Sequence, residues 1–239
     1  MAVSGGSIER QTSFQTAVAV SGATCPITFP RAPKAGELII IGVTLNGAGG
    51  GGVITPSGWQ QTTTNIYAAS ARQVVTIAKF ADGTEGTTIT LTSAGSPTQW
   101  CALTAAYSGY KMPMGGSIIN DISNGGSWGL CSGTNNGSST TCTVNGTASS
   151  VSPRVGFTVV GSNGAWSSPT VASNSATSAT VISTIDFTTT MSLAFIEVVN
   201  TNVTPSTSVT VTWPTSRNHT SGGFMIGSEN ARTMTVGVG

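Results

Sequence analysis

Apolar and polar residues alternate with a period of two along several stretches of this chain. The segments TTITLT at 87–92 and SVTVTW at 208–213 alternate most regularly, as strands do when one face is buried and the other meets water. No window keeps the 3.6-residue apolar period of a helix. The sequence therefore predicts ten strands, at Thr16–Val20, Glu37–Leu45, Gln73–Phe80, Thr87–Thr92, Trp100–Tyr107, Arg154–Val160, Ala179–Phe187, Leu193–Val199, Ser208–Trp213 and Gly223–Ser228.

One strand reads differently from the others, because residues 38–41 are continuously apolar. Such a run is typical of a strand that is covered on both faces. Turn signals separate the strands, among them Asn46-Gly47, Asp82-Gly83 and Asn163-Gly164. The predicted fold class is all-β: a β-sandwich, jelly-roll-like, of two antiparallel sheets, forming a single domain over residues 1–239.

The strand pattern recurs in the second half of the chain. GELIIIGVTLNG at 36–47 resembles SPRVGFTVVGSNG at 152–164, which places Asn163 at an offset of 117 residues from Asn46. VVTIAKF at 74–80 resembles LAFIEVV at 193–199, and TTITLT resembles SVTVTW with Val209 at an offset of 120 residues from Ile89. We therefore expect an internal duplication with halves at 16–109 and 151–230, joined by a connection at 110–150.

The segment Gly109–Ser150 is too long for an ordinary loop in a compact domain. It is rich in Gly, Ser and Asn, yet it contains Met112, Met114 and Trp128. Bulky apolar residues argue against a free linker. We expect the segment to lie along the sandwich or to contact a neighbouring subunit, with these three residues and Trp166 as candidate interface residues.

Tryptophan is the residue type most suited to stacking on sugars or anchoring an interface. For Trp59, Trp100 and Trp213, which lie at the ends of predicted strands, we favour a place in the core. Trp128 and Trp166 remain interface candidates.

Charge is scarce: 7% of the residues are Asp, Glu, Lys or Arg, whereas the chain has 39 Thr, 31 Ser and 31 Gly. Soluble domains usually carry about 25% charged residues. The net charge of +1 gives no electrostatic reason to expect nucleic acid or an anionic membrane as a partner. The N-terminal residues show no signal-peptide pattern, and no run reaches the roughly 20 apolar residues that span a bilayer. These features favour a rigid β-structure over an enzyme.

Few side chains could carry chemistry, so we predict no catalytic, cofactor-binding or metal-binding residues. His219 stands alone in the polar run SRNHTSGG, where a solvated loop histidine is the simpler interpretation. Asp82 and Glu85 share the turn ADGTEG. A weak cation site is conceivable there, but one turn supplies too few oxygens for calcium's usual 6–8, so we favour a solvated turn.

The four cysteines are Cys25, Cys101, Cys131 and Cys142, and none forms a CxxC pair. For Cys25 and Cys101 we expect small buried thiols. Cys131 and Cys142 flank the segment SGTNNGSSTT, which a disulfide could close. For this pair, a disulfide and two buried thiols are equally compatible with the sequence.

A longer pattern resembles a known group of proteins. The run FPRAPKAGELIIIGVTLNG is followed by ITPSGW at 54–59 and by VVTIAKFADGTEGTTITLTSAGSPTQWCALTAAYSGY. This succession resembles a loose family of phage and bacterial β-sandwich proteins, with a Gly-led apolar strand, a Pro-Ser-Gly-Trp turn and a closing strand that ends in AAYSG. The motifs define turns and core positions and name no chemistry.

The resemblance implies a virion or tail-associated protein of a phage. Our first hypothesis is a structural virion protein, most specifically a capsid decoration (cement) protein that acts by burying surface, assembled in the host cytoplasm. It would bind copies of itself, as a trimer, and other virion proteins. The alternative is a tail or fibre module that binds a host surface glycan. An enzyme is the third and least favoured hypothesis.

Overall fold

The computed structural model describes residues 8–46, 52–67, 72–95, 97–110, 112–118, 129–133, 137–147, 154–162, 169–173, 177–187, 191–200 and 206–227. These residues form antiparallel strands almost throughout, which confirms the all-β prediction. Each of the ten predicted segments overlaps a strand within this part of the chain.

The first half of the chain forms two sheets. The larger sheet has the order β2-β9-β4-β7-β6, and a short strand β1 extends the pairing along β9. The smaller sheet has the order β3-β8-β5. A 3₁₀ turn, η1 (Thr12–Phe14), separates β1 from β2. The strands are β1 (Glu9–Arg10), β2 (Thr16–Ser21), β3 (Thr24–Thr28), β4 (Leu38–Asn46), β5 (Val53–Ile54), β6 (Gln60–Tyr67), β7 (Arg72–Phe80), β8 (Thr88–Ser93) and β9 (Gln99–Ser108).

The second half forms one strongly curled sheet. Its strands follow the order β10-β11-β16-β12-β15-β14, and β13 pairs with β16. The strands are β10 (Gly129–Gly133), β11 (Gly137–Thr147), β12 (Arg154–Ser162), β13 (Thr170–Ser173), β14 (Thr177–Phe187), β15 (Met191–Asn200) and β16 (Ser206–Gly227).

The curl of this sheet comes from β16, a single strand of 22 residues. Its first part, 206–212, pairs with β11 and β13, while its last part, 219–227, pairs with β12. Between them the register with β11 shifts at Ser139/Thr141, so that residues 213–216 lie opposite Thr140 alone. Pro214 occupies this irregularity, where its missing N–H removes no ladder hydrogen bond. One strand therefore belongs to two layers.

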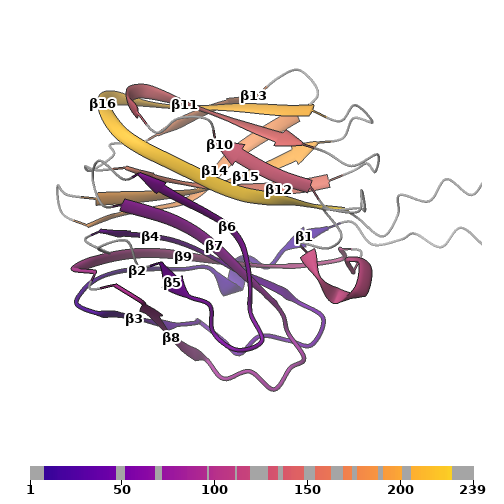
Figure 1. The fold of residues 1–239 in the computed structure, drawn as a ribbon. Helices are drawn as coiled ribbons and strands as arrows, with labels where there is room; N and C mark the ends of the chain where they lie inside the picture. The colour runs from indigo at the N-terminus through magenta and orange to yellow at the C-terminus, as the bar shows by residue number, and fades with distance from the viewer. Residues whose placement is uncertain are drawn as a thin grey trace, which may run out of the picture.

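Figure 1 shows four layers of strands. The strands β3, β5 and β8 form the lowest layer, and the large sheet of the first half lies above them. The strands β12, β14 and β15 form the third layer, and β11, β13 and the first part of β16 form the top. The sequence predicted a sandwich of two antiparallel sheets; the described residues form three sheets, because each half builds its own sandwich and the second half does so from one curled sheet.

The two halves have the same strand order. In the first half β2-β9-β4-β7-β6 lies against β3-β8-β5, and in the second half β10-β16-β12-β15-β14 lies against β11-β16-β13. Counted from β2 in the first half and from β10 in the second, the first strand of each half pairs with the eighth and the second with the seventh, as in a jelly roll. In the second half, the seventh and eighth strands are the two parts of β16. The structure therefore supports the duplication at the level of topology.

The duplication also holds residue by residue. Cys25 pairs with Leu91, and Cys142, which lies 117 residues after Cys25, pairs with Val211, which lies 120 residues after Leu91. These are the offsets that the sequence repeat gives.

Even an irregularity is shared between the halves. The register of β6 against β7 shifts between Gln61 and Thr63, and that of β14 against β15 shifts between Val181 and Ser183. The extra residues are Thr62 and Ile182, at equivalent positions. A β-bulge bends its strand, so both halves bend the same edge in the same place.

The halves pack through equivalent sheets. The strand β6 packs on β16, and its counterpart β14 packs on β9 and β2. Reciprocal contacts of this kind are the mark of a two-fold isologous interface. The chain is thus a fused pair of jelly rolls, related by an approximate two-fold axis.

Within the part of the chain that the structure describes, this arrangement makes three apolar cores. One lies inside each half, around Ile41, Val75 and Trp100 in the first and around Ile196, Val211 and Trp213 in the second. The third lies between the halves, with Leu38, Leu103, Phe195 and Phe224 among its members. Along β4, Leu38 and Ile40 point into this third core while Ile39 and Ile41 point into the first. This confirms that the continuous apolar run is a strand covered on both faces.

The connection between the halves is shorter than the expected range 110–150, because the second half begins within that range. Its residues 129–133 and 137–147 are the strands β10 and β11, which begin the second half. Its first part lies along the sandwich, as expected: Tyr110 and Ile118 are buried in the core between the halves, and the Gln60 side chain bonds the backbone of Gly116 and Ile118 at 2.8 and 2.9 Å.

Candidate functional site

The outermost layers present two faces that carry mainly threonine. On the lowest layer the outward positions of β3, β8 and β5 are all exposed, because their neighbours Cys25, Ile27 and Leu91 point inward. We call this set the lower face: Thr24, Pro26, Thr28, Ile54, Thr88, Thr90 and Thr92.

The top layer presents the equivalent set. Val209 and Val211 of β16, together with Cys142 of β11, point inward, so their neighbours point outward. We call these the upper face: Thr141, Thr143, Thr170, Ala172, Thr210 and Thr212. Of these, Thr170, Ala172 and Thr212 are exposed, and the others are partly buried.

The two faces match in register. Thr92 pairs with Thr24 on one side and Ile54 on the other. Thr212, which lies 120 residues after Thr92, pairs with Thr141 and Thr170. Threonine suits these positions because a β-branched side chain favours a strand and its hydroxyl stays in water. Neither face carries a charged residue at these outward positions.

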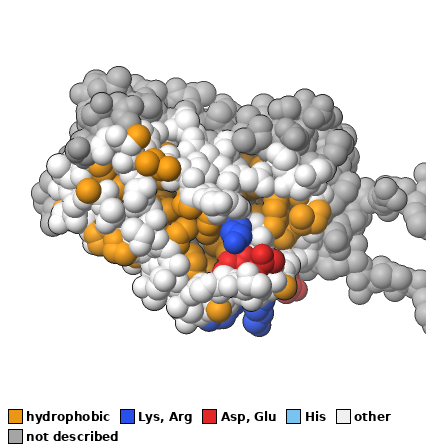
Figure 2. All heavy atoms as spheres, turned by 60° about the horizontal axis from the view of Figure 1, so that its bottom comes forward, with side chains coloured by type: hydrophobic (Ala, Val, Ile, Leu, Met, Phe, Trp, Pro, Cys, Tyr) orange, Lys and Arg blue, Asp and Glu red, His pale blue; other side chains and the backbone are white. Residues whose placement is uncertain are grey.

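Charged side chains occupy small areas of the described surface that Figure 2 shows. In Figure 2, which brings the bottom of Figure 1 forward, most of the described surface is neutral, and red and blue side chains cluster together near the lower centre between apolar patches. The individual ion pairs show how these charged side chains are held.

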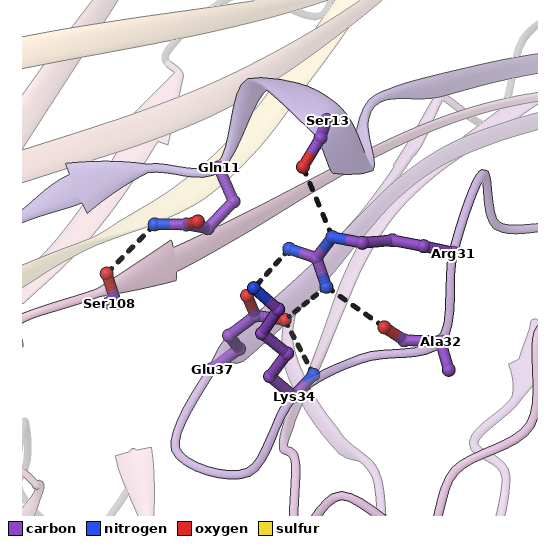
Figure 3. A network of polar contacts seen from close by, with 7 residues as sticks. All are labelled: Gln11, Ser13, Arg31, Ala32, Lys34, Glu37 and Ser108. Carbon is purple, nitrogen blue, oxygen red and sulfur yellow. Dashed lines mark hydrogen bonds and ion pairs between the residues drawn. The ribbon is translucent and has the colours of Figure 1, made fainter.

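The most enclosed ion pair joins Arg31 to Glu37. The Arg31 guanidinium donates to both carboxylate oxygens of Glu37, at 2.9 and 2.6 Å, and its Nε donates to Ser13 Oγ at 3.2 Å (Figure 3). The backbone N–H of Lys34 donates to Glu37 at 2.8 Å. Arg31 also lies 5.3 Å from the centre of the Phe14 ring. Arg31 therefore ties η1 to the β3–β4 loop through Ser13 and Phe14, and Glu37 in the same loop holds the guanidinium in place.

Burial alone would raise the pKa of Glu37. The hydrogen bonds from Arg31 and Lys34, with their positive charges, outweigh burial and hold this pKa below its ordinary value. The carboxylate is thus committed to a structural contact.

The ADGTEG turn closes on itself. Asp82 Oδ1 accepts from the N–H and the hydroxyl of Thr84, at 2.8 and 2.6 Å, and the Glu85 carboxylate accepts from the N–H groups of Asp82 and Gly83 at 3.0 and 2.9 Å. Lys79 Nζ lies 3.0 Å from Glu85. Both Glu85 oxygens and Asp82 Oδ1 thus have partners within the turn or on Lys79, and Asp82 is exposed.

One further polar contact joins the first half of the chain to the second. The Tyr107 hydroxyl donates to Glu197 Oε2 at 2.9 Å, and Arg10 Nε lies 3.6 Å from the same oxygen. Burial first, and the neighbouring Glu197 second, raise the pKa of Tyr107 well above its ordinary value. Tyr107 and Arg10 belong to the first half and Glu197 to the second, so this contact reinforces the core between them.

His219 is not solvated, contrary to the sequence interpretation. Its side chain is 1% exposed and meets the Trp213 ring edge-on, with ring centres 4.7 Å apart. The run SRNHTSGG reads as a loop because it is polar, but it lies within β16, and the strand turns the imidazole inward.

The cysteines are thiols where the structure describes them. Cys25, Cys101 and Cys142 are buried and form no disulfide, as expected for the first two. Cys131 pairs with Gly146, four residues along β11 from Cys142, which at about 3.4 Å per residue separates the two Cα atoms by roughly 14 Å. A disulfide needs less than about 7 Å. Of the two alternatives that the sequence left open for Cys131 and Cys142, the structure therefore excludes the disulfide, and Cys142 Sγ lies 3.7 Å from Ser221 Oγ.

The tryptophans divide as expected where they can be seen. Trp100 and Trp213 are 0% and 2% exposed, and Trp59 packs against the core of the first half. Trp128 and Trp166 lie outside the described residues. Of the methionines, Met112 is 51% exposed, and the Met114 side chain lies outside the described part.

Nothing in the sequence interpretation singled out the two threonine faces. The regular alternation of 87–92 and 208–213 was the available signal, but it indicates only that one side of each strand is polar. Only the pairing with β3, β5, β11 and β13 assembles these positions into arrays.

Within the described residues, no group of three His, Cys, Asp or Glu side chains could hold a metal ion, and no helix is long and apolar enough to cross a membrane. Comparison with protein-family models, with curated proteins and with solved structures finds no match to this chain.

Proposed function

We propose that this protein is a structural component of a phage virion, most specifically a capsid decoration (cement) protein that acts by burying surface and has no catalytic activity. The observation that carries the proposal is the use of its charges. Glu37, Glu85 and Glu197 each bind side chains or backbone of the same chain. The outermost sheets meet their surroundings with neutral hydroxyl groups instead.

Such a surface suits an assembly that is held by neutral contacts. Neutral hydroxyls cost less to desolvate than charges, so a hydroxyl-rich interface can be buried without paired ions. With few ion pairs to screen, the interface should depend weakly on salt. The apolar core between the halves joins two sandwiches into one stiff unit, which is the mechanical property that reinforcement of a shell requires.

The test is the presence of the protein on purified phage particles and its release from them. We expect it to co-sediment with particles, to stay bound as salt rises and to leave as urea rises. Absence from the particles, or release in moderate salt with retention in mild urea, would overturn the proposal. Glycan binding by the purified protein, without particle binding, would favour the tail or fibre alternative.

A further inference from the structure

The upper and lower faces are equivalent, neutral and directed to opposite sides of the molecule (Figure 1). We propose that they are docking surfaces for further copies of this chain, which stack face to face in open-ended rows. This goes beyond the proposed function and does not depend on it.

The chemistry of the faces favours a second copy as the occupant. A hydroxyl group both donates and accepts a hydrogen bond, so a threonine array is complementary to another threonine array. A face that carried charge of one sign would repel its own copy. The outward positions of both faces are neutral, and the net charge of the whole chain is only +1. Ile54, 50% exposed beside Thr92, adds an apolar contact on the lower face.

The internal architecture supplies the precedent. Within one molecule, a sheet of the first half already packs on the equivalent sheet of the second half, there through apolar side chains, whereas the outer faces carry mainly threonine. Stacked sheets lie about 10 Å apart, and a second copy on either outer face would continue that stacking. Because the duplication places a similar surface at each end, a docked copy leaves its far face open for the next one. Such an arrangement does not close on itself.

The size of each face sets the strength of the contact. Three strands at about 4.8 Å spacing, each about five residues long, cover only a few hundred Å². A stable interface buries about 800 Å² on each partner. One contact is therefore weak and reversible, and stacking should become visible only at high protein concentration or where other contacts already concentrate the chain.

The experiment places a charge on one face at a time. Thr92 and Thr212 are exposed and equivalent, so Thr92→Lys and Thr212→Lys make matched variants. Thr12→Lys, at an exposed position in η1 outside both faces, is the control. The full chain, the three single variants and the double variant Thr92→Lys/Thr212→Lys are compared by sedimentation velocity over a series of rising concentrations.

We expect the wild type and Thr12→Lys to form species larger than dimers, with an average mass that keeps rising with concentration in low and in high salt. Each single-face variant should stop at the dimer, because one end is blocked, and the double variant should remain a monomer of 24.0 kDa. The proposal is overturned if the wild type stays monomeric throughout, if it forms a closed oligomer of fixed size such as a trimer, or if either face variant stacks as the wild type does.

Discussion

Cys25 and Cys142 occupy the same position in the two halves of the molecule. Each lies on the second strand of its half, is 0% exposed and pairs with an apolar residue of the seventh strand, Leu91 or Val211. Burial raises the pKa of Cys25 to about 12 and that of Cys142 to about 11. Two thiols far apart in the sequence therefore share one environment.

This equivalence predicts equal protection of the two thiols. In the native protein at mildly alkaline pH, iodoacetamide should leave Cys25 and Cys142 unmodified, because both are inaccessible and both remain protonated. In urea both should react. Mass spectrometry of the digested protein gives the readout for each cysteine. A native digest containing a peptide that links Cys131 to Cys142 by a disulfide would contradict the register described above.

The Arg31–Glu37 pair should be a strong determinant of stability. Glu37 is 4% exposed, and removing one partner of a buried pair typically costs about 3–5 kcal/mol because the other charge remains buried. Since the Arg31 side chain is 22% exposed, the pair is only partly buried, and we expect Arg31→Met to lower the free energy of unfolding by about 1–3 kcal/mol, between the values for exposed and buried pairs.

The double variant Arg31→Met/Glu37→Met separates the charge from the packing. It should recover much of the loss, because no unpaired carboxylate is then left inside. Urea unfolding followed by circular dichroism measures all three proteins. If Arg31→Met were as stable as the wild type, the pair would not hold η1 to the β3–β4 loop.

The link between the halves can be tested through two tyrosines. Tyr107→Phe removes a hydrogen bond to the charged Glu197, and we expect a loss of about 1.5–3 kcal/mol in unfolding free energy. Tyr110→Phe removes a bond to the carbonyl of Gly36, at 3.0 Å, and should cost about 1 kcal/mol. Urea unfolding under identical conditions compares the two variants. Equal losses would show that the charge of Glu197 adds nothing to the contact.

Acid should destabilise the protein through two carboxylates. The pKa values of Glu37 and Glu85 lie below their ordinary value of 4.5, although burial opposes this shift in both, because Arg31 and Lys79 respectively hydrogen-bond them. The folded state then binds fewer protons than the unfolded state near that pH, so stability falls as pH drops through the folded pKa values. We expect thermal unfolding midpoints to be flat above about pH 5 and to fall below it. Glu37→Gln should weaken this acid dependence.

Stability should also fall at alkaline pH, because burial raises the pKa of two other groups. Burial raises the pKa of Cys25 from 9.0 to about 12 and of Tyr110 from 10.0 to about 12. The unfolded chain therefore loses these protons first, and the stability that they contribute is complete below about pH 9 and is lost as pH rises towards 12. Unfolding midpoints measured between those limits should decline steadily. Cys25→Ala, compared with the wild type, should flatten the first part of the decline.

The sequence predicted the strands whose burial is visible in their composition. The continuous apolar run of β4 and the alternation of β8 each follow from local residues, and the structure confirms both. It did not predict β6 or β11, which read QQTTTNIY and GSSTTCTVNGT. Polar residues and glycines of this kind are typical of loops, and only pairing with an apolar neighbour strand makes them part of a sheet.

The candidate site was harder to predict than the strands, because it too depends on contacts between residues that are distant in the sequence. Burial of His219 depends on Trp213 and on the bend of β16, and the threonine faces depend on strands that are distant in the sequence. The internal repeat was the stronger guide. Its offsets of 117 and 120 residues relate the pair Cys25–Leu91 in the first half to the pair Cys142–Val211 in the second. A duplication helps to predict distant pairings, because a strand pairing in one half is repeated between the equivalent strands of the other.

The long strand β16 has a mechanical consequence. In the first half the corresponding strands β8 and β9 are separate, whereas β16 continues from the outermost layer into the core between the halves. A pull along this strand is carried in shear by the ladders that join it to β10, β11, β12 and β13, so no single hydrogen bond has to yield first. We therefore expect the second jelly roll to resist a pull along β16 better than the first resists a pull along β8 alone.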